Sequence, residues 1–144
     1  MPDQIDSSSQ AVQIHLGIVQ SAIQRMAGNC TSCKAWCITI VSAILVLVAD
    51  KNRPMFAYIA LIPILLFLVL DAYYLAMERA FRNTYNQFVG KMHKGRLAAE
   101  DLYDVSPVGR IFLMTITSIW SFSVLSFYLM LFVMVLGMVH FILV

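Results

Sequence analysis

Three long stretches of this sequence lack charged side chains, and they constrain its fold more than any other feature. They cover residues 35–49, 55–70 and 111–144. A transmembrane helix needs about 20 mainly apolar residues. Only 12% of the 144 residues are charged and 60% are hydrophobic, whereas soluble domains hold about 25% charged residues. The sequence therefore predicts an all-α integral membrane protein, and a very apolar soluble helical protein is the weaker alternative.

Residues 1–29 form a segment of different character before the first span. Its apolar residues recur with spacings of 4, 3, 4 and 3, at Val12, Leu16, Val19, Ile23 and Met26. This heptad-type seam predicts an amphipathic helix from about residue 8, which we expect to break or kink at Gly28–Asn29. A helix that lies on a membrane usually has a polar face rich in Lys and Arg. This face carries glutamines and one arginine, which favours packing against other helices.

The spans are predicted at residues 33–49, 55–89 and 111–144, and the second of them extends beyond the membrane. Pro54 suits the start of the second helix, and Pro63 predicts a kink inside it. The stretch LDAYYLAMERAFRNTYNQF, Leu70–Phe88, contains no Gly or Pro. Thirty-five helical residues would measure about 50 Å, against about 30 Å for the hydrocarbon core. The second helix is therefore expected to reach well into the cytoplasm.

Residues 90–110 are predicted to be a basic cytoplasmic connector with a short helical piece near 97–103. Ser106 and Pro107 are expected to begin the last helix, whose membrane part is placed at about 120–141. Three spans with the N-terminus inside put most of the basic residues on the cytoplasmic side, as the positive-inside rule requires. These residues are Arg25, Lys34, Arg79, Arg82, Lys91, Lys94, Arg96 and Arg110. The expected location is a membrane, with membrane lipid as a direct partner; the resemblance described below implies that it is the bacterial inner membrane.

Asp71 is the first acid after sixteen uncharged residues. A carboxylate at the edge of the hydrocarbon must be paired, hydrated or protonated. Arg25 and Lys34 are its candidate partners, and Glu78 is expected to pair with Arg82 one turn further on. A structural lock between helices and a role in ion passage or gating are both consistent with these charges.

A basic and aromatic set follows on the same helix. Its members are Arg79, Arg82, Tyr85, Lys91, Lys94 and Arg96. Cations attract phosphates and aromatic rings stack on bases, which is the combination that holds nucleotides or single-stranded nucleic acid. Helix packing with the positive-inside signal, or contact with anionic lipid, explains the same residues.

The last helix begins with many hydroxyl side chains, of which Thr117, Ser118 and Ser121 are candidates to line a pore. Small polar residues also join helices within membranes. Three cysteines, at 30, 33 and 37, are expected to be buried apolar thiols because no further metal ligands lie beside them. No nucleophile–base pair, phosphate loop or metal motif is present in the sequence. We therefore expect neither enzymatic activity nor a cofactor.

Two motifs resemble those of a known group of proteins. IQRMAGNCTSCKAW (Ile23–Trp36) resembles the pattern IxRMAxNSxxxKxW, and LDAYYLAMERAFRNTY (Leu70–Tyr85) resembles LDAYYLxxERxFRxLY. Both patterns occur in small bacterial transmembrane effectors of antiphage defence operons, of the Hailong type, which are paired with a nucleotidyltransferase. The resemblance covers about residues 12–89. Cys30 stands where the pattern has Ser, and Thr84 where it has Leu.

The resemblance implies a homo-oligomeric ion channel that a nucleotide or single-stranded DNA ligand gates or holds closed. Three spans leave little room for a conduit inside one protomer, so a pore requires several copies. A non-conducting membrane scaffold or accessory subunit of a defence complex is the alternative, and it needs only the amphipathic N-terminal face. A small transporter is a third hypothesis, for which the sequence specifies no substrate.

Overall fold

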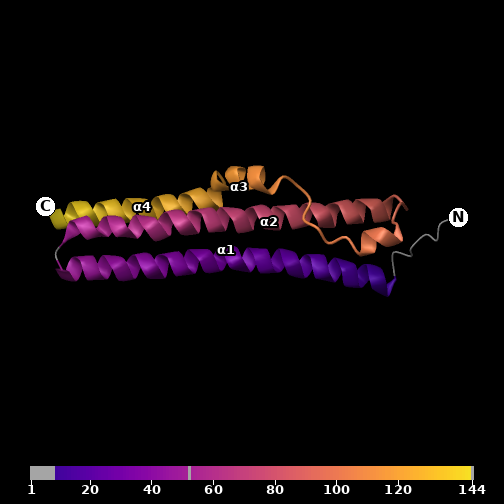
Figure 1. Cartoon of the computed structure of the whole chain (residues 1–144), viewed down its shortest axis with the longest axis horizontal. Coiled ribbons are helices and arrows are strands. Elements are labelled where there is room, and N and C mark those ends of the chain that lie inside the picture. The colour runs from indigo at the N-terminus through magenta and orange to yellow at the C-terminus, as the bar shows by residue number, and fades with distance from the viewer. Residues whose placement is uncertain (1–8, 52, 144) are drawn as a thin grey trace.

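The computed structural model describes residues 9–51 and 53–143, which form a long helical hairpin with a third helix packed along part of it (Figure 1). The elements are α1 (Gln10–Lys51), η1 (Pro54–Ala60), α2 (Leu61–His93), η2 (Ala99–Leu102), α3 (Ile111–Ile119) and α4 (Phe122–Leu143). Three of these helices are long and apolar enough to cross a membrane. The all-helical prediction is therefore confirmed for the described residues.

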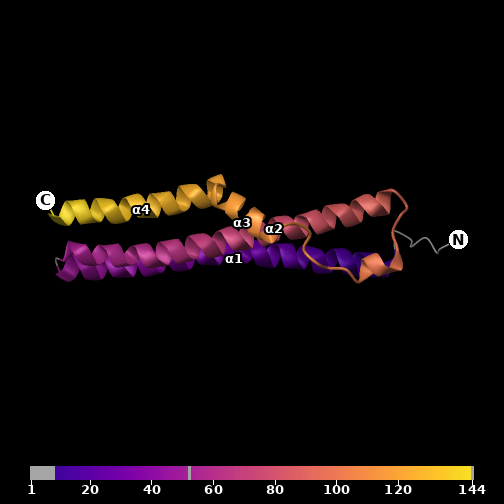
Figure 2. The same ribbon diagram turned by 45° about the horizontal axis from the view of Figure 1, so that its top comes forward.

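Both views show α4 running beside the half of the hairpin that contains its turn (Figure 2). We call residues 33–70 together with α4 the spanning half. The opposite half consists of residues 10–29, residues 74–93 and η2, and we call it the stalk. Segment 103–110 returns from the stalk to α3, which leads into α4.

Helix α1 is continuous, so the predicted break at Gly28–Asn29 is wrong. A glycine inside a helix costs only about 1 kcal/mol relative to alanine. Buried side chains on both sides of it, Ala22 and Cys33, hold α1 in place. The predicted N-terminal helix and first span are thus one rod of 42 residues, about 63 Å long. Residues 1–8 of the predicted N-terminal segment lie outside the described residues.

The second helix begins at Pro54 as predicted, first as the 3-10 helix η1 and then as α2. The change of helix type falls two residues before Pro63. Pro63 thus lies in the first turn of α2, where backbone N–H groups have no partner within the α-helix. The N–H that proline lacks therefore removes no hydrogen bond from the helix interior. Helix α2 then continues to His93, which confirms the predicted uninterrupted helix through Leu70–Phe88. It ends in a Schellman motif, with Gly95 at φ 62.

The last helix does not begin at Ser106 and Pro107, and this prediction is wrong. Residues 104–108 are not helical, because main-chain groups of this segment bond to α2 instead of to one another. Helix α3 begins at Ile111 and ends before Trp120, and α4 follows after a short break. The predicted membrane part at 120–141 therefore corresponds closely to α4, and the separate helix α3 precedes it.

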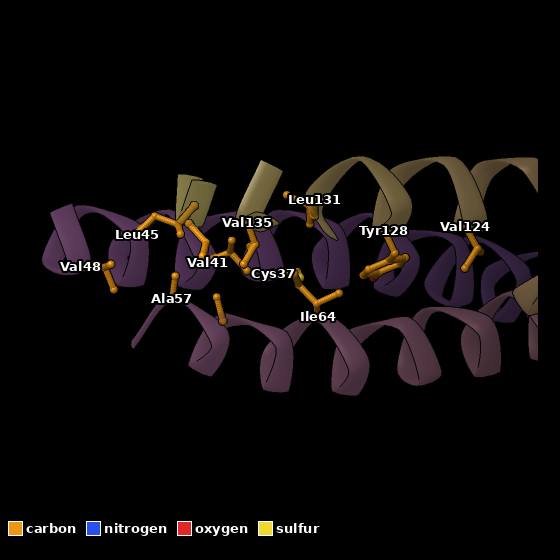
Figure 3. Packing of buried hydrophobic residues seen from close by; sticks show 12 residues of the cluster. Cys37, Val41, Leu45, Val48, Ala57, Ile64, Val124, Tyr128, Leu131 and Val135 are labelled. Carbon is orange, nitrogen blue, oxygen red and sulfur yellow. The ribbon is translucent and has the colours of Figure 1, made fainter. Parts of the chain in front are cut away.

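A continuous apolar cluster fills the spanning half (Figure 3). Its buried members come from α1, η1, α2 and α4, and Tyr128 is the largest of them. The Tyr128 hydroxyl donates to the main-chain oxygen of Phe67 at 3.0 Å. Cys33 and Cys37 are buried and Cys30 is half-buried, as expected for apolar thiols. The stalk has a smaller cluster around Val12 and Phe88.

Candidate functional site

An ion pair is buried between α1 and α2, where the spanning half meets the stalk. Lys34 Nζ lies 2.5 Å from Asp71 Oδ2, and the Asp71 side chain has no exposed surface. Of the two predicted partners of Asp71, Lys34 is therefore the one that pairs, and Arg25 is exposed on α1. The other carboxylate oxygen of Asp71 has no hydrogen-bond partner among the described residues. Removing one member of such a pair leaves an uncompensated buried charge.

Arg79 joins α2 to the junction of α3 and α4, and we call this contact the clasp. Its guanidinium donates to Ser118 Oγ at 3.1 Å and to Ser121 Oγ at 3.3 Å. Ser118 is fully buried. Asp71 precedes Arg79 by eight residues, so the ion pair lies about 12 Å further into the spanning half.

The clasp brings together residues for which the sequence suggested separate roles. Arg79 was predicted to bind a ligand, and Ser118 and Ser121 to line a pore. In this chain they bond to one another, which makes Arg79 a positioning group for α3 and α4. Thr117, the third predicted pore residue, is exposed and donates to the main-chain oxygen of Met114 at 3.0 Å. Its hydroxyl is satisfied within its own helix.

A groove runs along the stalk between α1 and α2. It has a volume of about 400 Å³ and is lined by Gln20, Ile23, Gln24, Arg82, Tyr85 and Asn86. Two of the predicted ligand residues, Arg82 and Tyr85, therefore lie in it. The predicted pair is also present, since Arg82 Nη2 lies 2.8 Å from Glu78 Oε1 and 60% of the Arg82 side chain is exposed. We call this feature the stalk groove.

The stalk groove combines three kinds of group that suit one class of ligand. The guanidinium can hold a phosphate, and the tyrosine ring can stack on a base. The side-chain amides of Gln20, Gln24 and Asn86 offer both donors and acceptors, which can read the edge of a base. Neither the amides of α1 nor their approach to Arg82 and Tyr85 was part of the prediction. Predicting this groove would have required knowing the rotation of α1 about its own axis relative to α2.

The other predicted ligand residues lie outside this groove. Lys91 Nζ lies 2.6 Å from Asp101 Oδ1, which joins α2 to η2. This hydrogen bond is the main cause that lowers the pKa of Asp101 below its usual value, and the hydrogen bond from the Ala98 N–H lowers it further. The same hydrogen bond to Asp101 is the main cause that raises the pKa of Lys91. Lys94 and Arg96 are exposed at the end of α2. The predicted set is thus divided among the clasp, the stalk groove and the end of the stalk.

Sequence reasoning missed His15, which is buried in the stalk. Its ring stacks on Phe88 with 4.1 Å between centroids, and its Nδ1 lies 3.0 Å from the main-chain oxygen of Leu102. Nε2 has no partner within the part of the chain that the structure describes. The signal was its spacing, three residues after Val12 and four before Val19. The centre of the seam therefore lies at His15 and not at Leu16, which is only half-buried.

Thr84 fastens the returning segment to α2. Its hydroxyl donates to the main-chain oxygen of Ser106 at 2.8 Å and accepts from the N–H of Val108 at 3.2 Å. This is one of the two positions at which the chain departs from the pattern of the resemblance, and leucine is usual there. A leucine side chain could not make either hydrogen bond, so the departure has a structural role here.

Comparison with known proteins gives no relative of this chain. It matches no protein-family model, and no match to it was found among curated proteins or solved structures. Among the described residues, no group of three or more His, Cys, Asp or Glu side chains is arranged to hold a metal ion. The resemblance to the Hailong-type effectors stays a prediction.

Proposed function

We propose that the chain is one subunit of a homo-oligomeric ion channel of the bacterial inner membrane, with its N-terminus and stalk in the cytoplasm. A nucleotide or single-stranded nucleic acid bound in the stalk groove controls the channel. The observation that carries this proposal is that the groove and the buried ion pair share one uninterrupted helix. Arg82 follows Asp71 by eleven residues, about 16 Å along α2.

Ligand binding acts on α2 through the Arg82–Glu78 pair. Because the Arg82 side chain is 60% exposed, water competes for its guanidinium and weakens this pair, although Glu78 is half-buried. A phosphate that binds the guanidinium competes with Glu78, and a base that stacks on Tyr85 adds about 1–3 kcal/mol. The rigid helix then transmits a shift of the groove to Asp71, where Lys34 of α1 is the partner that must move with it.

The conduit lies between copies of the chain. Apolar side chains fill the interior of the spanning half, so one protomer offers no polar path of its own. The role in antiphage defence, beside a nucleotidyltransferase that makes the ligand, rests on the resemblance of residues 12–89.

The test is ion flux from liposomes that contain the purified chain, with and without short single-stranded DNA or nucleotides. Arg82→Glu and Tyr85→Ala should weaken ligand binding at least tenfold and remove the ligand's effect on flux. Arg96→Glu is the matched control, because it reverses an exposed charge at the end of the stalk. Equal loss of binding in the Arg96 variant would place the ligand elsewhere, and absence of flux under every condition would refute the channel.

A non-conducting scaffold is the second candidate, and one observation favours it. Ile14 and Ile18 of the stalk are 55% and 51% exposed, which is unusual for isoleucines next to water in a helix with an apolar seam. A partner protein on this face would cover them. The scaffold predicts no conductance in pure liposomes and loss of partner capture when both isoleucines become glutamine.

A further inference from the structure

A second hollow lies at the end of the spanning half, beside the turn that joins α1 to η1. It has a volume of about 560 Å³, and five of its lining residues are apolar. The other two are Lys51 and Arg53, which lie on the two sides of the turn. The hollow thus has apolar walls and a basic mouth.

The walls expose more apolar surface than a water-covered pocket usually does. Leu47 is 63% exposed, and Phe56 and Ile59 are each 49% exposed. They belong to α1 and η1, at the point where the first candidate span ends and the second begins. At this level the hydrocarbon of a membrane gives way to phosphates, so apolar walls and basic groups face the two parts of one lipid.

The two basic groups have little competition from acids. Lys51 Nζ lies 3.5 Å from Asp50 Oδ2, and both side chains are at least 70% exposed, so this pair is weak. The main-chain N–H of Arg53 donates to the Val48 oxygen at 3.4 Å, and this bond ties the turn to α1. The guanidinium of Arg53 is exposed at the mouth.

We propose that this hollow binds one phospholipid with an anionic headgroup. Lys51 and Arg53 hold the phosphate, and Leu47, Phe56 and Ile59 hold the first part of an acyl chain. Charge decides between a lipid and a second copy of the chain, because a copy related by two-fold symmetry would bring the same cations together. This binding does not depend on channel activity.

The experiment measures lipid binding to the purified full chain by native mass spectrometry. The probes are phosphatidylglycerol and phosphatidylcholine with identical acyl chains. The test variant is Lys51→Gln with Arg53→Gln, and the matched control is Lys94→Gln with Arg96→Gln, which removes two exposed charges at the other end of the molecule. A third variant, Ile59→Trp, fills the hollow without changing its charge.

We expect the wild type and the control to retain phosphatidylglycerol in preference to phosphatidylcholine. The test variant should bind phosphatidylglycerol about thirtyfold more weakly, the effect of two basic residues that each contribute about 1 kcal/mol near a membrane surface. Ile59→Trp should lower the binding of both lipids. Equal retention of both lipids by the wild type, or unchanged retention by the test variant, would overturn the proposal. A disulfide between two copies at Leu47→Cys, in a chain without its own cysteines, would also overturn it.

Discussion

The two halves of the α1–α2 hairpin are held together by different interactions. In the spanning half, twelve buried residues from four elements form one apolar cluster, and the Lys34–Asp71 pair lies where this half meets the stalk. The apolar cluster of the stalk has only three buried members, Val12 and Phe88 from its two helices and Leu97 from the segment between α2 and η2. Polar contacts supplement it there, and they come from the segment that returns over α2.

This difference separates a rigid part of the molecule from an adjustable one. An apolar cluster has few alternative arrangements of similar energy, because its side chains interlock. Exposed hydrogen bonds and ion pairs each contribute little to the free energy of folding. A ligand can therefore replace them, and a change of pH can break them. The stalk is therefore the more adjustable half, and the Lys34–Asp71 pair lies where the two halves meet. Four predictions test this contrast.

The largest effect is expected from breaking the buried pair. Asp71→Ala leaves Lys34 without its partner and should lower the free energy of unfolding in detergent micelles by about 3–5 kcal/mol. Glu78→Ala breaks the stalk pair and leaves Arg82, whose side chain is 60% exposed, free to be hydrated, so it should cost less than about 1 kcal/mol. The double change Asp71→Leu with Lys34→Met should restore most of the lost stability, because no buried charge remains. Equal effects of Asp71→Ala and Glu78→Ala would remove the contrast between the halves.

The clasp should come next, because it joins the two halves. Arg79→Met removes two hydrogen bonds from a charged donor and leaves the buried Ser118 hydroxyl unpaired, at a cost of about 2 kcal/mol. In a chain whose only cysteine is introduced by Trp120→Cys, chemical labelling of that thiol should become faster as the junction of α3 and α4 loosens. Arg82→Met is the matched control and should leave that labelling rate unchanged. If both variants label alike, Arg79 does not position the junction.

Much of the fold could be predicted because the strongest signals are long. The uncharged runs placed the candidate spans, and the absence of Gly and Pro between Leu70 and Phe88 indicated one continuous α2. The errors arose where packing outweighs a local signal. Gly28 indicates a helix break only when α1 is considered without the helices that pack against it. Ser106–Pro107 indicates a helix start only when the hydrogen bonds of this segment to Thr84 are not known.

The candidate site was less predictable than the fold. Pairing of Asp71 with Lys34 was among the alternatives, but nothing in the sequence could separate Lys34 from Arg25, since both lie upstream on one helix. The basic set on α2 was treated as one surface. A helix distributes such residues around its axis, and their assignment to the clasp, the groove or η2 depends on which neighbour lies on each side.

A smaller effect is expected where the returning segment meets α2. Thr84→Val keeps the shape of the side chain but removes its hydrogen bonds to Ser106 and Val108. We expect a loss of about 1 kcal/mol in stability and faster hydrogen exchange at the Val108 amide. Thr84→Ser should keep both hydrogen bonds and the slow exchange. The exchange at Tyr128, in the spanning half, should not respond to either variant, and a response there would show that the halves are coupled.

The smallest effect is a pH dependence confined to the end of the stalk. The folded-state pKa of Asp101 is lowered by its bonds to Lys91 and the Ala98 N–H, so its contribution is present above the ordinary carboxyl pKa of about 3.9 and is lost as the pH falls through the lowered value. The pKa of Lys91 is raised, so its contribution is present below about 10.4 and is lost as the pH rises through the raised value.

Between these limits the contact should be constant, with its losses only in acid below about pH 4 and in base above about pH 10. Hydrogen exchange at the Ala98 amide, which donates to Asp101 Oδ2 at 3.0 Å, provides the measurement once rates are divided by their intrinsic values. Its protection should fall in acid in the wild type, and Asp101→Asn should remove that acid transition. Since the Lys91 side chain is half exposed and the contact lies at the end of the stalk, the change should stay local to η2. A parallel fall in protection across the spanning half would mean that the stalk and the spanning half unfold as one cooperative unit. The stalk would then not be adjustable independently of the spanning half.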